Sequence, residues 1–301
     1  MKAVIYEKYG DADVLNLTDI EKPVPKKDEI LIKIIATSVS AADWRLRKAD
    51  PFLARLFNGL FKPRRIKVLG YELAGIVEEG GSDVREFNVG DPVFAYCMLK
   101  FGGYAEYTCL KETDIISLKP ENMSFEEAAT TPLGALTAFS LLKKAKVTSG
   151  QKILIYGASG SVGTYAIQFA KYFGAEVTSV CSSKNIELVK SLGSDYTVDY
   201  TQTEITSLNA TFDIVFDAVG KISKSTIRKI ISQNGKFVTV KSQTKPSKRE
   251  LQFVKELIES RNLISVIDKT YKLKDIRAAH MYVEQFRKRG NVAVLVQEGL
   301  I

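Results

Sequence analysis

Residues 152–163 read KILIYGASGSVG, a compact apolar segment that runs directly into three glycines, Gly157, Gly160 and Gly163. The residues that follow, as far as Gly174, have the apolar spacing of an amphipathic helix. A strand, a glycine-rich turn and a helix in this order are typical of a turn that binds a dinucleotide, because the helix N-terminus offers free N–H groups to the pyrophosphate. The pattern departs from the common G-x-G-x-x-G, since Ala158 takes the place of its first glycine.

This turn is therefore predicted to hold a nucleotide cofactor. The alternative is a glycine-rich turn that serves only the packing of the helix against the strand. The candidate cofactor contacts in the turn are Gly157, Ala158, Ser159, Gly160, Ser161, Val162 and Gly163.

The second strand after the turn bears on which dinucleotide binds. It ends at Cys181 and continues as Ser182, Ser183 and Lys184, with no acidic residue. A site that prefers NAD usually has Asp or Glu here, which holds the ribose 2′-hydroxyl and would repel a 2′-phosphate. Hydroxyls and a lysine suit the phosphate instead, so the sequence predicts NADP(H). The alternative is that Lys184 begins a helix on a solvated surface.

The sequence pattern differs between the first third of the chain and the part after residue 151. After residue 151, short apolar segments alternate with helical ones, which indicates βαβ units and a parallel sheet. Here we predict strands at 152–157, 176–181, 196–200, 212–219, 236–240 and 291–296, and helices at 161–174, 185–193, 247–260 and 273–288. The first third is rich in β-branched residues between glycines, which favours a β domain with strands at 2–6, 14–20, 29–38, 68–79, 92–97 and 103–110. Ser124 and Glu127 form a capping-box pattern where the sequence pattern changes.

Length and composition are those of an ordinary globular protein. The chain has 301 residues, of which 45% are hydrophobic and 26% charged, which suits two domains and excludes disorder. Three cysteines cannot build a disulfide framework or a four-thiolate zinc site, so we expect a cytoplasmic protein. The single histidine, His280, lies in the last predicted helix, away from every motif, and is expected to be structural.

Most of the net charge of +8 comes from one segment. Residues 45–67, RLRKADPFLARLFNGLFKPRRIK, contain eight basic residues and one acidic residue, a net charge of +7. Apolar and aromatic residues are interleaved with the basic ones. Three interpretations stay open: a solvated helix with its apolar face on the domain, a lid that steers an anionic substrate or cofactor, or a surface that contacts anionic lipid. We expect no nucleic acid as a partner.

Seven motifs follow one another along nearly the whole chain. They are ATSVSAADWRLR (36–47), VLGYELAGIV (68–77), VGDPVF (89–94), GGYAEY (102–107), EEAATTPLGALTA (126–138), IYGASGSVG (155–163) and FDAVG (216–220). With these motifs the chain resembles the medium-chain dehydrogenase/reductase superfamily, and within it the zinc-independent quinone oxidoreductase branch, which includes zeta-crystallin-like and alkenal-reducing enzymes. The resemblance implies an α/β protein with a GroES-like β domain at 1–122 and 259–301, and a Rossmann domain with a doubly wound parallel sheet at 123–258.

The resemblance also implies an activity, NADPH-dependent hydride transfer to quinones or α,β-unsaturated carbonyls. Two alternatives stay open: an NADP-linked alcohol or aldehyde reductase that works without zinc, and a non-catalytic NADPH-binding sensor.

The same resemblance implies further site residues. Ser40 stands where many members carry an asparagine near the nicotinamide, and Asp43 follows at the matching position. Ser40 and Tyr71 also stand where the zinc alcohol dehydrogenases of the superfamily have a cysteine and a histidine as ligands, so no metal is expected. The candidate catalytic residues are Ser40, Asp43 and Tyr71; for Tyr71 the alternative is a packed aromatic beside Gly70. The positions that match the cofactor pocket of the family are Thr131, Thr137, Tyr200, Val219 and Gly220.

The resemblance also bears on assembly. Members usually have a further Rossmann strand, at the edge where two subunits pair, between the fifth strand and the next helix. Here residues 236–240 run through KSQTKPSK almost directly into that helix. We therefore expect a five-stranded sheet, and a homodimer is possible only without the usual edge strand. Glu72 is expected to order the interface between the domains.

Overall fold

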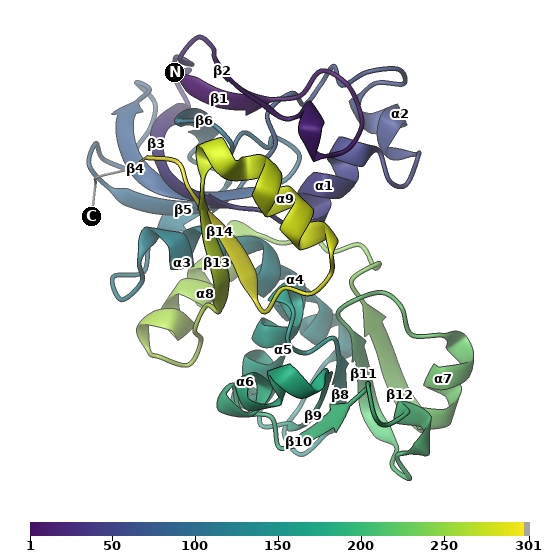
Figure 1. Ribbon diagram of the computed structural model, residues 1–301. Coiled ribbons are helices and arrows are strands. Elements are labelled where there is room, and N and C mark those ends of the chain that lie inside the picture. The colour runs from purple at the N-terminus through teal and green to yellow at the C-terminus, as the bar shows by residue number, and fades with distance from the viewer. Residues whose placement is uncertain (298–301) are drawn as a thin grey trace.

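The computed structural model describes residues 1–297, which form two lobes (Figure 1). One lobe is built on a largely antiparallel sheet and contains both the start of the chain and its last strand. The other lobe is built on a parallel sheet from the middle of the chain. The expected combination of a β domain and a Rossmann-type domain is confirmed.

The sheet of the β lobe has seven strands within the described residues, in the order β13-β14-β3-β4-β5-β7, with β6 paired to β3. Its strands are β3 (Glu29–Ser38), β4 (Glu72–Gly80), β5 (Pro92–Tyr96), β6 (Tyr107–Lys111), β7 (Ile115–Leu118), β13 (Ile267–Lys272) and β14 (Asn291–Leu295). A smaller antiparallel pair consists of β1 (Lys2–Ile5) and β2 (Asn16–Asp19). The helices of this lobe are α1 (Ala41–Lys48), α2 (Ala54–Asn58), α3 (Phe125–Ala129) and α9 (Ile276–Glu284).

The parallel sheet has five strands in the described part of the chain, in the order β10-β9-β8-β11-β12, so the predicted five-stranded sheet is confirmed. Its strands are β8 (Lys152–Tyr156), β9 (Glu176–Cys181), β10 (Tyr196–Asp199), β11 (Phe212–Asp217) and β12 (Ile231–Thr239). The helices beside it are α4 (Pro132–Ala145), α5 (Ser161–Tyr172), α6 (Ile186–Ser191) and α7 (Lys224–Ile230), whereas α8 (Lys248–Glu259) packs against α4 and against β7 of the β lobe.

Helices cover both faces of the parallel sheet, as expected for a doubly wound fold. Ile153 and Ile155 of β8 pack in a cluster that includes residues of α4 and α5. Leu154, which points the opposite way, packs in a different cluster with Ile230 of α7. A strand buried on both faces is a continuous apolar run, which is why KILIY could be identified from sequence.

The boundary between the lobes lies close to α3. Both hydrogen bonds of the predicted capping box between Ser124 and Glu127 are present and start this helix. The helix then packs against β3 and β4 of the β lobe. The division into 1–122 with 259–301 and 123–258 therefore stays a prediction, and residues 125–129 pack with the β lobe.

Two helical predictions are wrong in extent. The helix expected at 273–288 is a 3₁₀ turn followed by α9, and the chain leaves the helix before Phe286, whose φ is 57°. The basic segment 45–67 is not one helix, because α1 ends at Lys48 and only α2 follows before a loop. Five large apolar side chains of residues 52–61 are exposed, whereas Phe57 of α2 packs against an apolar cluster of the β lobe, so the segment packs only part of its apolar residues on the domain.

Candidate cofactor and active site

The predicted phosphate turn joins β8 to α5, with Gly160 as the N-cap of the helix. A Cβ at Gly163 would lie 2.3 Å from the carbonyl oxygen of Gly157, so close packing of helix on strand requires glycine there. A Cβ at Gly160 would meet only that same carbonyl, at 3.5 Å, which is ordinary contact. Packing inside the protein therefore does not require a glycine at position 160. A ligand that closely approaches the backbone here would require one, because a Cβ would occupy its space. The turn fits a pyrophosphate.

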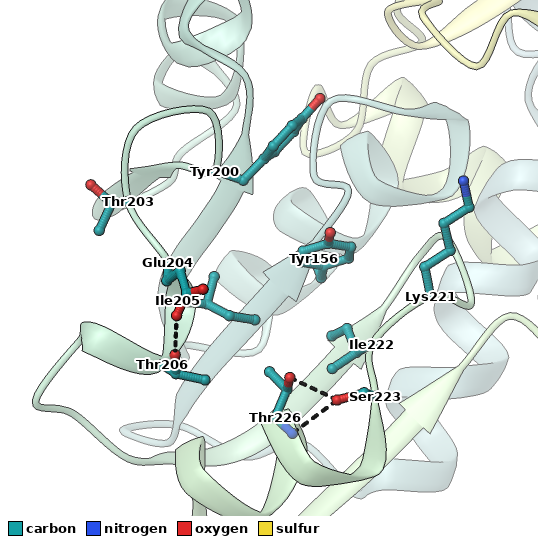
Figure 2. Close-up of a pocket in the computed structure, with 10 residues that line it drawn as sticks. All are labelled: Tyr156, Tyr200, Thr203, Glu204, Ile205, Thr206, Lys221, Ile222, Ser223 and Thr226. Carbon is teal, nitrogen blue, oxygen red and sulfur yellow. Dashed lines mark hydrogen bonds between the residues drawn. The ribbon is translucent and has the colours of Figure 1, made fainter.

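A cavity of about 320 Å³ opens beside this turn, at the carboxyl ends of three parallel strands. Tyr156 is the last residue of β8, Tyr200 directly follows β10, and Lys221 follows β11. Figure 2 shows Tyr200 and Lys221 on opposite sides of the cavity, with Tyr156 between them. Ligand pockets have volumes of about 300–1,000 Å³, so the cavity suits one part of a dinucleotide, such as the adenosine.

The structure brings the predicted residues after β11 to the same place. The backbone N–H groups of Val219 and Gly220 both donate to the buried carboxylate of Asp217, at 3.0 and 2.7 Å, which shapes the loop that leads to Lys221. Lys221 was not predicted as a residue of this site, although it directly follows Gly220. The general rule that ligands of parallel sheets bind outside the carboxyl ends of the strands could have found it.

The residues predicted for the 2′-phosphate lie at the end of β9. The side chains of Ser183 and Lys184 are exposed, and Lys184 makes no ion pair within residues 1–297. The hydroxyl of Ser183 donates to Asp199 at the end of the neighbouring strand β10. This carboxylate was also missed, because sheet pairing and not sequence proximity places it there.

Asn185 connects the end of β9 to the phosphate turn. Its Nδ2 donates to Ser159 Oγ at 2.9 Å and to Ser182 Oγ at 3.3 Å. Its Oδ1 is buried and has no hydrogen-bond partner within the described residues. A buried acceptor without a donor costs free energy, so a hydroxyl of a bound nucleotide would suit this position.

The two threonines predicted near the nicotinamide differ. Thr131 is fully buried, and its hydroxyl donates to the carbonyl of Glu127 at 2.7 Å and accepts from Tyr165 at 3.1 Å. Thr137 lies on α4 and is partly exposed. Of the pair, Thr137 is the one whose side chain is accessible to a ligand.

The three candidate catalytic residues lie together in the β lobe. Ser40 and Asp43 form the capping box that begins α1, with Ser40 Oγ donating to Asp43 Oδ2 at 2.5 Å. The other oxygen of Asp43 accepts from the N–H of Gly70 at 2.9 Å, which links α1 to the segment that carries Tyr71. Burial raises the pKa of Asp43 to about 6, and these hydrogen bonds oppose the rise. Asp43 is fully buried, so this geometry favours a positioning role.

Tyr71 has the accessible donor of the three. Its ring packs between Phe101, with centroids 4.1 Å apart, and Tyr96, at 6.3 Å. Its hydroxyl has no hydrogen-bond partner within residues 1–297 and is not among their buried, unpaired polar atoms. Burial raises the pKa of this phenol far above its ordinary value, so the hydroxyl stays protonated and can donate.

A network of buried polar side chains lies next to Asp43. The Arg47 guanidinium lies 3.1 Å from His280 Nδ1, and His280 Nε2 lies 3.1 Å from the Tyr104 hydroxyl, whose pKa is raised by burial and by the nearby carboxylate of Asp43. Arginine can only donate, so Nδ1 accepts, and Nε2 carries the proton and donates to Tyr104. Arg47 is itself paired with Glu284. His280 is fully buried and contacts two of the motifs through Arg47 and Tyr104, so it does not lie away from them, and its structural role stays a prediction.

Glu72 joins the two lobes, as expected. Its carboxylate accepts hydrogen bonds from Ser38 Oγ and from the N–H of Leu133, the latter at 2.7 Å, at the start of α4. Burial raises the pKa of Glu72 to about 7. A second connection lies at the phosphate turn, where the N–H of Gly290 donates to the carbonyl of Ser159 at 2.8 Å. The segment before β14 therefore contacts the turn directly.

Comparison with known proteins agrees with this architecture. A family model described as "Alcohol dehydrogenase GroES-like domain" matches residues 26–120, and one described as "Zinc-binding dehydrogenase" matches residues 161–287. The chain is 35% identical to the 2-methylene-furan-3-one reductase of Solanum lycopersicum, over 98% of this chain and 79% of that protein. The chain belongs to the medium-chain dehydrogenase/reductase superfamily.

Two further members place the chain in the quinone oxidoreductase branch of the superfamily. The chain is 36% identical to the chloroplastic NADPH-dependent alkenal/one oxidoreductase of Arabidopsis thaliana, over 82% of this chain and 64% of that protein. The quinone oxidoreductase of Coxiella burnetii superposes with a TM-score of 0.86 and 28% identity, over 99% of both chains.

The zinc implied by the second family description does not fit the residues present. At the two ligand positions of the superfamily's zinc enzymes, this chain offers the Ser40 hydroxyl, bonded to Asp43, and the Tyr71 phenol, which keeps its proton. Zinc in proteins is bound by thiolate, imidazole and carboxylate groups. No group of three or more His, Cys, Asp or Glu side chains within residues 1–297 is arranged to hold a metal ion.

Proposed function

We propose that this chain is an NADPH-dependent oxidoreductase that transfers a hydride to quinones or α,β-unsaturated carbonyls without zinc. The observation that carries the proposal is the free, protonated hydroxyl of Tyr71, at a position where zinc members of the superfamily hold their metal. The names of the tomato and Arabidopsis relatives, a furanone reductase and an alkenal/one oxidoreductase, support the same class of acceptor.

When bound, the cofactor would supply a hydride from C4 of its nicotinamide, and the enolate or phenolate that results would take a proton from water to give the saturated ketone or the hydroquinone. The chain's own part is to bind it, to orient the acceptor and to provide a hydrogen-bond donor. The Tyr71 hydroxyl donates to the carbonyl oxygen of the acceptor, which draws electron density from the carbon that accepts the hydride. The Asp43 network fixes the N–H of Gly70 and therefore the backbone that carries Tyr71. An already polarised enone or quinone needs less help than a simple alcohol or aldehyde, so a phenol can replace a metal ion.

The choice of NADP(H) rests on the adenosine end of the site. Lys184 supplies an exposed, unpaired cation, and Ser182 and Tyr200 supply hydroxyls on neighbouring segments. The Ser183 hydroxyl donates to Asp199 and would have to turn away from it to contact a phosphate. The phosphate turn and Asn185 hold the rest of the dinucleotide.

We also propose a cytoplasmic location, a possible homodimer and contact with a membrane surface. Three free cysteines support a cytoplasmic location. A homodimer would form without the usual edge strand, since β12 ends the parallel sheet in the described part of the chain. Residues 45–67 would contact an anionic membrane surface. Among residues 1–297, no helix is both long and apolar enough to cross a bilayer.

The test is NADPH oxidation by the full chain with a panel of acceptors: quinones, alkenals, saturated aldehydes and a control without acceptor. We expect turnover with alkenals or quinones and none with saturated aldehydes. Turnover with aldehydes alone would support the alcohol or aldehyde reductase instead. Tight NADPH binding without turnover on any acceptor would support the sensor.

A further inference from the structure

Five large apolar side chains between residues 52 and 61 face solvent. Phe52, Leu53, Leu56, Leu60 and Phe61 are 64%, 67%, 71%, 45% and 85% exposed. We call residues 52–65 the apolar-basic loop. Single exposed apolar residues are normal on a soluble protein, but such a group within ten residues marks an interaction site.

The apolar-basic loop is held in place and is not loose. Asn58 is fully buried, and its side chain donates to Tyr6 Oη at 2.7 Å and accepts from the N–H of Ile66 at 2.6 Å. Its carbonyl accepts from the N–H of Arg64 at 2.7 Å, and Tyr9 Oη donates to the carbonyl of Gly59 at 2.7 Å. These bonds close the base of the loop and leave Leu60 and Phe61 at its tip.

The cations of this region are free to meet an anionic partner. Arg47 and Lys48 are paired with Glu284, and Lys48 also with Asp11. Six others make no ion pair within residues 1–297: Arg45, Arg55, Lys62, Arg64, Arg65 and Lys67. The one acidic residue of the segment is Asp50.

Cations and apolar side chains are mixed within the loop. The Arg55 guanidinium lies 5.2 Å from the ring centroid of Phe52, and that of Arg65 lies 4.5 Å from the ring of Phe57. A soluble anion would use the cations alone, and an apolar substrate would use the apolar side chains alone. An anionic bilayer uses both, because its headgroups attract Lys and Arg while apolar side chains enter the boundary with the acyl chains.

We propose that the apolar-basic loop is a preformed anchor for an anionic lipid bilayer, with Phe52, Leu56 and Phe61 inserted at the level of the headgroups. The proposal explains the location of the loop if the proposed function holds, because Phe57 packs in the same apolar cluster as Tyr71 and Phe101. Binding to the bilayer would bring the site next to the phase in which apolar quinones dissolve. Figure 1 shows α2 at the opposite end of the molecule from β10 and β12, so the parallel sheet does not obstruct this approach.

The test is co-sedimentation of the full chain with vesicles of phosphatidylcholine alone or mixed with phosphatidylglycerol. We expect binding to the anionic vesicles, weakened by salt, and little binding to the neutral ones. The double variant Leu56→Ser/Phe61→Ser and the triple variant Lys62→Glu/Arg64→Glu/Arg65→Glu should each lower the partition coefficient more than about tenfold. The matched controls are Val89→Ser, an exposed apolar residue elsewhere, and Lys27→Glu/Lys144→Glu, which should bind like the unaltered chain.

Three outcomes would overturn the proposal. They are no binding to anionic vesicles, equal binding to neutral and anionic vesicles, and double and triple variants that bind like the controls. Self-association in solution that the double variant abolishes, without vesicle binding, would identify a second copy of the chain as the occupant. Turnover with a water-soluble enone, measured without vesicles, should be the same in all variants. A chain that binds vesicles but reduces no acceptor would refute the proposed function and leave the anchor standing.

Discussion

The hydroxyl of Tyr71 combines a raised pKa with the absence of a hydrogen-bond partner in the described part of the chain. Replacing Tyr71 with Phe removes the donor and keeps the ring that packs on Phe101. We expect kcat for an enone to fall by about tenfold to a thousandfold, since loss of one donor to a developing oxyanion costs up to that much. Cofactor binding should not change. Steady-state kinetics and fluorescence titration with NADPH measure the two effects.

The control for this variant is Tyr107→Phe, in strand β6 of the same lobe. It should leave kcat unchanged. If Tyr71→Phe behaved like this control, the phenol would be a packed aromatic with no part in the reaction.

Lys184 tests the choice of cofactor. The variant Lys184→Ala removes an exposed, unpaired cation at the end of β9, so KM for NADPH should rise by about tenfold. KM for NADH should stay the same, because that cofactor has no 2′-phosphate. Lys190→Ala, on the exposed side of α6, is the matched control. A parallel rise for both cofactors would contradict a role for Lys184 in phosphate binding.

Single residues show how far sequence reasoning reaches. Gly157, Gly160 and Gly163 could be assigned because one local turn contains them all and its chemistry is local. Asp199 and Lys221 were missed, since the pairing of β10 with β9 and the loop after β11 bring them to the cofactor end. Arg47 and Tyr104 are both hydrogen-bonded to His280 in the fold, but the three residues lie far apart in the sequence, so no local sequence pattern predicts their contacts.

In the strand–turn–helix unit of β8 and α5, packing inside the protein requires glycine at position 163, whereas at position 160 only ligand binding would require it. Gly160→Ala should leave the free energy of unfolding nearly unchanged, since its Cβ makes only ordinary contact. It should still weaken NADPH binding, because the Cβ would occupy space that the pyrophosphate needs. Gly163→Ala should lower the free energy of unfolding by about 2 kcal/mol or more, since its Cβ meets backbone atoms at 2.3 Å. Urea unfolding and NADPH titration of both variants check this. Normal NADPH affinity in Gly160→Ala would refute a pyrophosphate at the turn.

Glu72, which joins β4 to α4, gives a pH dependence with a definite sign. Its pKa is about 7 in the folded chain, against about 4.3 for an unperturbed Glu, so the folded state binds the proton more tightly. Its contribution to stability is fully present below the unfolded pKa and is lost as the pH rises to about 7. Relative to Glu72→Gln, the wild type should lose up to about 1.4 kcal/mol of unfolding free energy per pH unit within that window.

Urea unfolding across this pH range measures the difference. Glu79→Gln, an exposed position on the same strand, is the control and should follow the wild type at every pH. If the free energy of unfolding changed with pH by the same amount in the wild type and in Glu72→Gln, Glu72 would not titrate in this range.

Elements were predictable where their pattern is self-contained. The alternation of apolar strands and amphipathic helices predicted the parallel sheet, and the short connection at residues 241–248, compared with the family, predicted its end at β12. One helix over the whole basic segment, one of its three open interpretations, does not form, because the N–H groups of Ile66 and Arg64 donate to Asn58 and close a loop after α2. Leu60 and Phe61 are exposed in this closed loop, and Phe52, Leu53 and Leu56 are exposed before it, which favours the interpretation that the segment binds anionic lipid.

The whole molecule consists of a cofactor lobe and a β lobe that share one apolar cluster and are joined by specific polar contacts. Glu72 reaches the first turn of α4, and Gly290 reaches the phosphate turn. The candidate catalytic residues lie in one lobe and the cofactor residues in the other, so chemistry depends on how the lobes meet. The sequence motifs predicted both lobes. They could not predict the polar contacts between the two lobes, because those contacts depend on tertiary packing.

The most direct test of direct hydride transfer without zinc uses NADPH labelled with deuterium at C4 of the nicotinamide. The full chain, treated with a strong metal chelator, reduces methyl vinyl ketone with each labelled epimer in turn, and the product is examined by mass spectrometry and NMR. We predict one deuterium at the β-carbon of the saturated ketone from one epimer only, and the same rate with each cofactor whether or not the chelator is present. Loss of turnover in chelator, or a product without deuterium from either epimer, would contradict the account.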